Sequence, residues 1–166
     1  MKNKILPLIL VISMMAVVAV SGCIQSDASS INGLSSTITN HLKNGDNYFN
    51  TAVINTNKYS LDDASSNANS ALSEFNSAKS SAQQALSYAQ SSKDSVFIEY
   101  MQNTVGEIDS RVSATSELQQ AITYFKQKDS VNGNNHVILA NSYMDRSNQY
   151  KASNNDLVNE NPSKFK

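Results

Sequence analysis

Residues 61–91 read LDDASSNANSALSEFNSAKSSAQQALSYAQS, and small apolar side chains recur through this stretch at alternating steps of four and three. Because an α-helix turns once every 3.6 residues, this alternation keeps them on one side of a helix. Most of the polar residues between them are serine and asparagine, which are mediocre helix formers, so the helix depends on tertiary packing. The stripe comprises Ala64, Ala68, Ala71, Phe75, Ala78, Ala82, Ala85 and Ala89, widened by Leu61, Leu72 and Leu86. Its short side chains predict a close approach of a neighbouring helix.

A second long helix is predicted over residues 94–127, where bulkier side chains repeat at the same helical spacing. Gly106 lies within this segment and indicates either a kink or a close helix contact. Large side chains here complement the alanines of the preceding helix, as close packing requires. The stripe comprises Phe97, Met101, Val105, Ile108, Val112, Thr115, Leu118, Ile122 and Phe125.

The flanking segments have weaker patterns. Apolar residues predict a helix over 29–57, although Asn44-Gly45-Asp46 interrupts it with turn-forming residues; the register continues across them, so we favour one helix, bent if anything. Residues 129–135, reading DSVNGNN, are the clearest predicted loop. A last helix follows and frays from Asn154 onward. Its apolar positions are Val137, Ile138, Ala140, Met144 and Tyr150.

Together these patterns predict an all-α protein, an antiparallel up-down four-helix bundle of long helices. The alternative is a pair of tetratricopeptide-like repeats, with the first helix broken at Gly45. The absence of a visible 34-residue self-similarity counts against it. We expect the bundle domain to cover 31–155, with a flexible tail at 156–166.

The N-terminus has the parts of a secretory signal. Lys2 and Lys4 precede sixteen uncharged residues, ILPLILVISMMAVVAV, and small residues follow. The alternative is a retained transmembrane helix, but residues 5–22 are near the lower length limit for spanning a bilayer. We therefore expect 1–22 to be a signal peptide that is removed.

The signal ends at Val20-Ser21-Gly22-Cys23, which contains the only cysteine. This stretch resembles the lipobox of prokaryotic membrane lipoproteins. The resemblance implies cleavage between Gly22 and Cys23, a diacylglyceryl group on the Cys23 sulfur, and a lipidated cysteine and tether over 23–30. With serine- and asparagine-rich polar faces behind a lipobox, the chain is similar to small cell-surface lipoproteins of methanogenic archaea. The implied location is the extracytoplasmic face of the cell membrane.

Charge and motifs exclude several function classes. Without Lys2 and Lys4, 11 basic side chains face 14 acidic ones, and no basic patch indicates nucleic-acid binding. No common nucleophile, zinc or phosphate-loop motif is present. A calcium loop around Gly133 fails because Lys128 and Leu139 would occupy ligand positions. We therefore expect no enzyme activity, no metal and no cofactor.

The remaining candidate residues are few. His41 and His136 lack an identifiable third metal ligand, and we place Glu99, Glu107 and Asp109 on a solvated helix face. Tyrosine side chains either line a ligand groove or fill the edges of the core. We favour a lipid-anchored bundle with an interaction or structural role and a protein partner. The alternative is a ligand-binding or sensory bundle acting through a partner, with an interior cavity. The five tyrosines considered as candidates for lining a ligand groove are Tyr88, Tyr100, Tyr124, Tyr143 and Tyr150.

Overall fold

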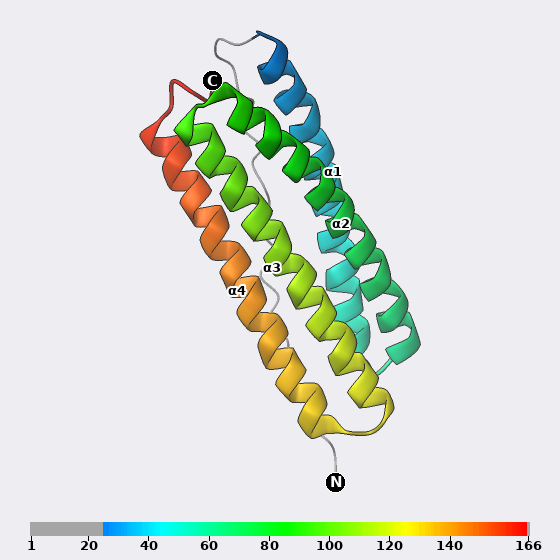
Figure 1. The fold of residues 1–166 in the computed structure, drawn as a ribbon. Helices are drawn as coiled ribbons and strands as arrows, with labels where there is room; N and C mark the ends of the chain where they lie inside the picture. Colours follow the sequence, from blue (N-terminus) through cyan, green and yellow to red (C-terminus); the bar gives the residue numbers. More distant parts are fainter. Residues whose placement is uncertain (1–24, 166) are drawn as a thin grey trace.

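The computed structural model describes residues 25–165, which form four long α-helices (Figure 1). They are α1 (Gln25–Asn57), α2 (Leu61–Ser92), α3 (Ser95–Lys126) and α4 (Ser130–Glu160). Each has 31–33 residues and is therefore about 45–50 Å long. No strand occurs within the described residues. The predicted all-α four-helix bundle is confirmed.

Consecutive helices run antiparallel and pack as two hairpins, α1 with α2 and α3 with α4 (Figure 1). The hairpins meet mainly through α2 and α3, and α1 touches α3 at only a few points. Between residues 25 and 165, the backbones of α1 and α4 make no close approach. Because α1 runs unbroken through Gly45, the protein does not adopt the tetratricopeptide-like alternative, which needed a break there.

The core follows the sequence pattern most closely in α2. Its eight buried residues are the predicted stripe of seven alanines and Phe75, and each is 0% exposed. In α3, Met101, Ile108, Leu118 and others of the predicted stripe are also buried. Val105 and Val112 are only half-buried at the edge of this core, so the buried face is rotated from the predicted one.

Three glycines bring helices close to aromatic rings. A Cβ at Gly45 would lie 2.4 Å from Cε1 of Phe75, and a Cβ at Gly106 would lie 2.7 Å from Cζ of Tyr150. Gly133 stands in the same relation to the ring of Phe125 in α3, at 2.4 Å. The glycines at these positions are therefore sites of close helix contact, which was one of the two interpretations of Gly106.

Each connection between helices is short and contains one residue with left-handed backbone. These residues are Tyr59, Lys93 and Lys128, with φ of 64°, 58° and 63°. The Asp94 carboxylate accepts hydrogen bonds from the amides that open α3, and Asp129 does the same at the start of α4. The predicted loop over 129–135 is therefore wrong. Asp129 caps a helix that already includes Ser130, so the turn residues after it lie within α4.

The two ends of the bundle domain also differ from prediction. The expected fraying from Asn154 does not occur, because α4 continues to Glu160. After α4, Phe165 is 5% exposed and packs with Ile31 of α1, so the segment predicted as a loose tail docks onto the bundle. Residues predicted as a tether after the cysteine are helical from Gln25.

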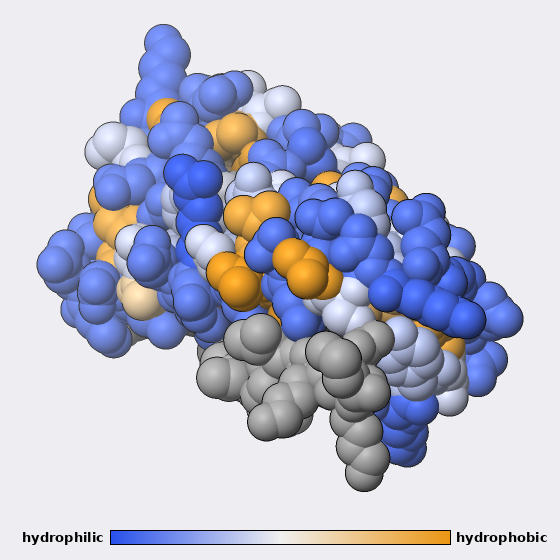
Figure 2. All heavy atoms as spheres, turned by 90° about the horizontal axis from the view of Figure 1, so that it is seen from below, coloured by the Kyte–Doolittle hydropathy of each residue, from blue (hydrophilic) through white to orange (hydrophobic). Residues whose placement is uncertain are grey.

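The surface of the described residues is mainly hydrophilic. Figure 2 looks onto the end with the α1–α2 and α3–α4 connections, where hydrophobic side chains occur in small groups among hydrophilic ones. Scattered exposed apolar side chains of this kind are normal for a folded domain. Over residues 25–165, no helix has both the length and the apolar character that crossing a membrane requires. The large hydrophobic side chains that are exposed on this surface are Tyr48, Ile54, Tyr59, Val131, Ile138 and Leu139.

Candidate functional site

The predicted processing site, Gly22 and Cys23, lies outside the described residues. Helix α1 begins at Gln25, two positions after the cysteine. The start of α1, the α2–α3 connection and the C-terminal segment all lie at one end of the bundle (Figure 1). Any group attached at Cys23 is therefore joined to the chain close to that end.

Four charged residues of α1, α3 and α4 interact electrostatically, and we call them the buried ionic cluster although Lys151 is only partly buried: Asp46, Glu107, Arg111 and Lys151. Arg111 and Glu107 have side chains that are each 1% exposed. Arg111 Nη2 donates to Glu107 Oε1 at 2.8 Å, and Nη1 donates to Asp46 Oδ1. The guanidinium carbon also lies 5.9 Å from the ring centroid of Phe75. Arg111 therefore joins α3 to α1, and the charge of Lys151 in α4 acts on the same two carboxylates.

Burial and mutual attraction shift the pKa values in this cluster. Burial raises the pKa of Glu107 and of Asp46, because the opposing attraction of Arg111 is smaller than the cost of desolvating each carboxylate. Burial acts to lower the pKa of Arg111, but Asp46 and Glu107 together outweigh it and raise that pKa. Burial lowers the pKa of Lys151, and the charge of Arg111 adds to this effect. At neutral pH Arg111 therefore keeps its positive charge, and this charge stabilises the ionised carboxylates of Glu107 and Asp46.

These shifts predict how stability changes with pH. The folded protein binds protons at Glu107 and Asp46 more tightly than the unfolded chain does, so the free energy of unfolding falls as pH rises above their ordinary values of 4.5 and 3.8. Asp94 acts oppositely: its pKa is lowered, because hydrogen bonds from Lys164 and two backbone amides outweigh desolvation. Stability should therefore rise towards about pH 4 and then decline. Urea unfolding followed by circular dichroism across this range measures the profile.

The matched variant for this profile is Glu107→Gln, which removes one of the two carboxyl groups whose pKa is raised. Its decline above about pH 4.5 should be shallower than that of the wild type. Asp63→Asn, which changes an exposed carboxylate in α2, should leave the decline as it is. A decline of equal slope in Glu107→Gln and wild type would contradict the role of Glu107.

Placing Glu107 on a solvated helix face was wrong. Thr104 and Arg111 continue the three-and-four spacing of the α3 seam with Met101, Ile108 and Thr115, and all are buried. Glu107 is one turn before Arg111 and is buried with it. The Glu107–Arg111 spacing and the seam position of Arg111 were visible signals. They were missed because charged residues are seldom fully buried unless they are paired.

The other predicted acids on this helix behave differently. Glu99 is exposed, as predicted. Asp109 is partly exposed, and its Oδ1 lies 2.7 Å from Nζ of Lys79 in α2. The three acids therefore do not form a site together.

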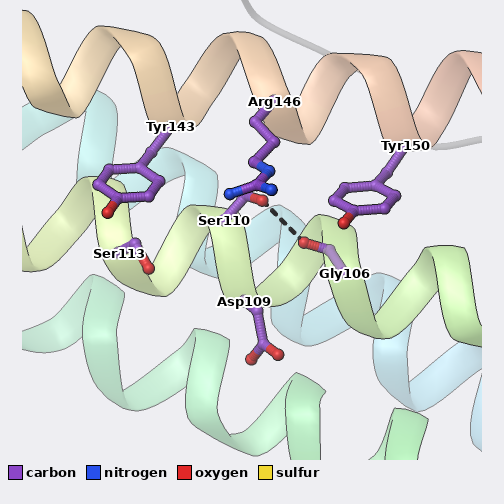
Figure 3. Close-up of a pocket in the computed structure, with 7 residues that line it drawn as sticks. All are labelled: Gly106, Asp109, Ser110, Ser113, Tyr143, Arg146 and Tyr150. Atoms are coloured by element: carbon purple, nitrogen blue, oxygen red, sulfur yellow. Dashed lines mark hydrogen bonds between the residues drawn. The ribbon is translucent and has the colours of Figure 1, made fainter.

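A shallow, open groove of about 210 Å³ lies between α3 and α4, and we call it the α3–α4 groove (Figure 3). From α4, Tyr143, Arg146 and Tyr150 extend toward α3, with Arg146 between the two rings. Small residues of α3 form the opposite wall, where the Ser110 hydroxyl donates to the carbonyl of Gly106 at 2.8 Å. The groove exists because this wall of α3 has little side-chain volume. Its remaining lining residues are Ser113 and Asp109.

The two histidines lie on different hairpins, and each pairs with a glutamate. His41 Nδ1 lies 2.7 Å from Oε2 of Glu74, which joins α1 to α2. His136 Nδ1 lies 2.6 Å from Oε2 of Glu117, which joins α4 to α3, and its ring stacks on Tyr124. Within residues 25–165, no three His, Cys, Asp or Glu side chains are grouped to hold a metal ion.

The predicted tyrosines separate into three places. Tyr143 and Tyr150 line the α3–α4 groove, and Tyr124 contacts His136. Tyr88 and Tyr100 pack against the small cluster of Ile31 and Phe165 at one end of the bundle. The core contains the alanine stripe, Phe75 and Phe125, whereas the ligand-binding alternative expected an interior cavity lined by tyrosine, methionine and polar residues.

Comparison with protein-family models, with curated proteins and with solved structures finds no match to this chain.

Proposed function

We propose that this protein is a lipid-anchored, extracytoplasmic lipoprotein whose helical bundle has a non-enzymatic interaction role. The lipid on Cys23 would hold the bundle at the cell membrane, and the bundle would bind a protein partner there. Two acyl chains give a stable anchor where one gives only marginal binding, since each buried CH₂ contributes about 0.8 kcal/mol.

The observation that carries this proposal is the order of features at the N-terminus. Two lysines, the sixteen uncharged residues 5–20 and the lipobox Val20-Ser21-Gly22-Cys23, which shares Val20 with that run, follow one another without a gap. A four-residue motif alone is weak, but its position directly after a charged and an apolar region matches what signal processing needs. Thioether formation at Cys23 would use the only thiol of the chain.

The geometry of the bundle supports an upright arrangement. Because α1 starts two residues after Cys23, almost no flexible chain separates the proposed anchor from the bundle. The α2–α3 connection and the C-terminal segment would then face the membrane (Figure 1). The α1–α2 and α3–α4 connections would lie about 45–50 Å further out.

Cys23→Ala should abolish lipidation and release the protein from the membrane. Without the thiol no diacylglyceryl group can attach, so the precursor should stay unprocessed or the protein should leave the membrane fraction. Metabolic labelling with a radioactive fatty acid, detergent phase partition and gel mobility measure the three effects.

Ser21→Ala is the matched control, because it keeps a small residue next to the cleavage site and leaves the cysteine in place. It should be labelled and anchored like the wild type. If Cys23→Ala is labelled and fractionates with membranes as the wild type does, the lipoprotein proposal is wrong.

A further inference from the structure

We propose that the α3–α4 groove is the docking site for an acidic segment of a partner protein, with Arg146 binding a carboxylate of that segment. This inference rests on the proposed interaction role of the bundle and assigns it a surface and a partner chemistry.

Arg146 is one of only two arginines in the chain, and the other cationic side chains are lysines. Arg111, the other arginine, is buried and binds two carboxylates. Arg146 is exposed, and among residues 25–165 no carboxylate lies within ion-pair distance of it. A guanidinium presents a planar fork that matches a carboxylate with two parallel hydrogen bonds. The position therefore has the geometry of a carboxylate-binding group whose partner comes from outside the described chain.

Neutral donors surround this cation. The hydroxyls of Ser113, Tyr143 and Tyr150 make no hydrogen bond to another described residue. Figure 3 shows the two tyrosine rings on either side of Arg146 and Ser110 of α3 opposite its guanidinium. Hydroxyls placed beside a guanidinium can donate to the oxygens of the same bound acid. The lining is therefore better suited to accept an anionic segment than a cationic one.

The one acidic lining residue does not neutralise Arg146. Asp109 points away from the groove toward α2, where Lys79 binds it at 2.7 Å (Figure 3). Asp145, next to Arg146 in the sequence, is not part of the lining. The groove thus offers a local positive charge on a protein whose formal net charge is −1.

The shape favours a protein segment over a small molecule. Small-molecule sites bury most of the ligand in a deep cavity, whereas this groove is shallow and open along the helices. Tyrosine and arginine are also the residues that contribute most often to protein–protein binding energy. The ring of Tyr150 lies against Gly106, where a Cβ would stand 2.7 Å from its Cζ.

The test is a nuclear magnetic resonance titration of the full chain in detergent micelles with two capped peptides, Gly-Glu-Glu-Gly and Gly-Gln-Gln-Gly. The acidic peptide should cause saturable shifts at the amides of Ser110, Ser113, Tyr143, Arg146 and Tyr150, and the amide peptide should not. Arg146→Gln should weaken binding of the acidic peptide by about tenfold or more, because the charge-assisted pair is lost. Lys43→Gln removes an exposed positive charge from α1 and should leave the affinity unchanged.

Several results would overturn this assignment. Absence of saturable shifts with the acidic peptide would remove it, as would equal weakening by Lys43→Gln and Arg146→Gln. Acetate, inorganic phosphate and glucuronate are titrated in parallel. If any of them binds as tightly as the acidic peptide, the groove is a small-anion or sugar-acid site instead. Since none of these measurements depends on Cys23, their failure is distinguishable from failure of the lipoprotein proposal.

Discussion

Arg111→Met is expected to lower the free energy of unfolding by about 3–5 kcal/mol, the largest effect of any single change in the polar part of the bundle. Methionine fills a similar length but removes the charge that Glu107 and Asp46 depend on. Glu107 is 1% exposed, so its carboxylate would be left in the interior, where the charge of Lys151 is the other one that acts to lower its pKa. Urea unfolding at neutral pH, followed by circular dichroism, measures the loss.

Arg146→Met is the matched control, because it removes the other arginine from an exposed position. It should change stability by no more than about 0.5 kcal/mol. The triple variant Asp46→Asn/Glu107→Leu/Arg111→Met should recover most of the loss, since replacing a whole buried ionic group by apolar side chains is often neutral or stabilising. If Arg111→Met costs no more than Arg146→Met, the buried ionic cluster does not stabilise the bundle as inferred.

The sequence was most informative where side-chain size and burial agree. In α2 the predicted stripe and the buried residues coincide, because alanine and phenylalanine at that spacing have no other favourable place than a helix interface. The short connections after Asn57 and Ser92 were also predicted, because the apolar repeat stops near each of these residues. The four-helix architecture follows from the repeat and from the absence of proline between Cys23 and Asn161, since proline would interrupt long helices.

The register of α3 could not be obtained from hydrophobicity alone. Val105 and Val112 satisfy a helical repeat, yet the buried seam runs through Thr104 and Arg111. A hydrophobic pattern assigns polar residues to the surface, and this rule fails where a charge is buried with its partners. The partner Asp46 comes from α1, 65 positions away in the sequence. Only the three-dimensional arrangement brings these groups together, so the cluster and the α3–α4 groove were not predicted.

Turn-forming residues are a second place where a local sequence rule fails because tertiary packing outweighs it. Asn44-Gly45-Asp46 and the Asn-Gly-Asn-Asn stretch of 132–135 have weak helix propensity, but both are helical. At Gly45 and Gly133 the missing side chain makes room for Phe75 and Phe125, so tertiary packing outweighs the local cost of glycine. These glycines mark where a ring of the hairpin partner lies directly against a helix backbone.

Phe75→Ala should lower the free energy of unfolding by about 3–5 kcal/mol, because it empties the centre of the interface between α1 and α2. The ring is 0% exposed, lies against Gly45 and faces the Arg111 guanidinium at 5.9 Å. Its removal therefore takes away both packing and a cation–π contact with the buried ionic cluster. Urea unfolding measures the loss, and Leu72→Ala, a half-buried position on the same helix, should cost clearly less.

The close contact between Phe75 and Gly45 predicts that one substitution will change sign with its background. In the wild type, Gly45→Ala should destabilise by about 1–3 kcal/mol, since the new Cβ would lie 2.4 Å from a ring that is fully buried. In Phe75→Ala the ring is gone, so the same methyl fills space, and the better helix propensity of alanine should add about 0.5–1 kcal/mol of stability. Gly33→Ala controls for propensity, because nothing lies within 4 Å of its Cβ; it should stabilise α1 by a similar amount in both backgrounds. A double-mutant cycle in urea gives the coupling. An equal effect of Gly45→Ala in both backgrounds would show that glycine is required there for a reason other than room for the ring.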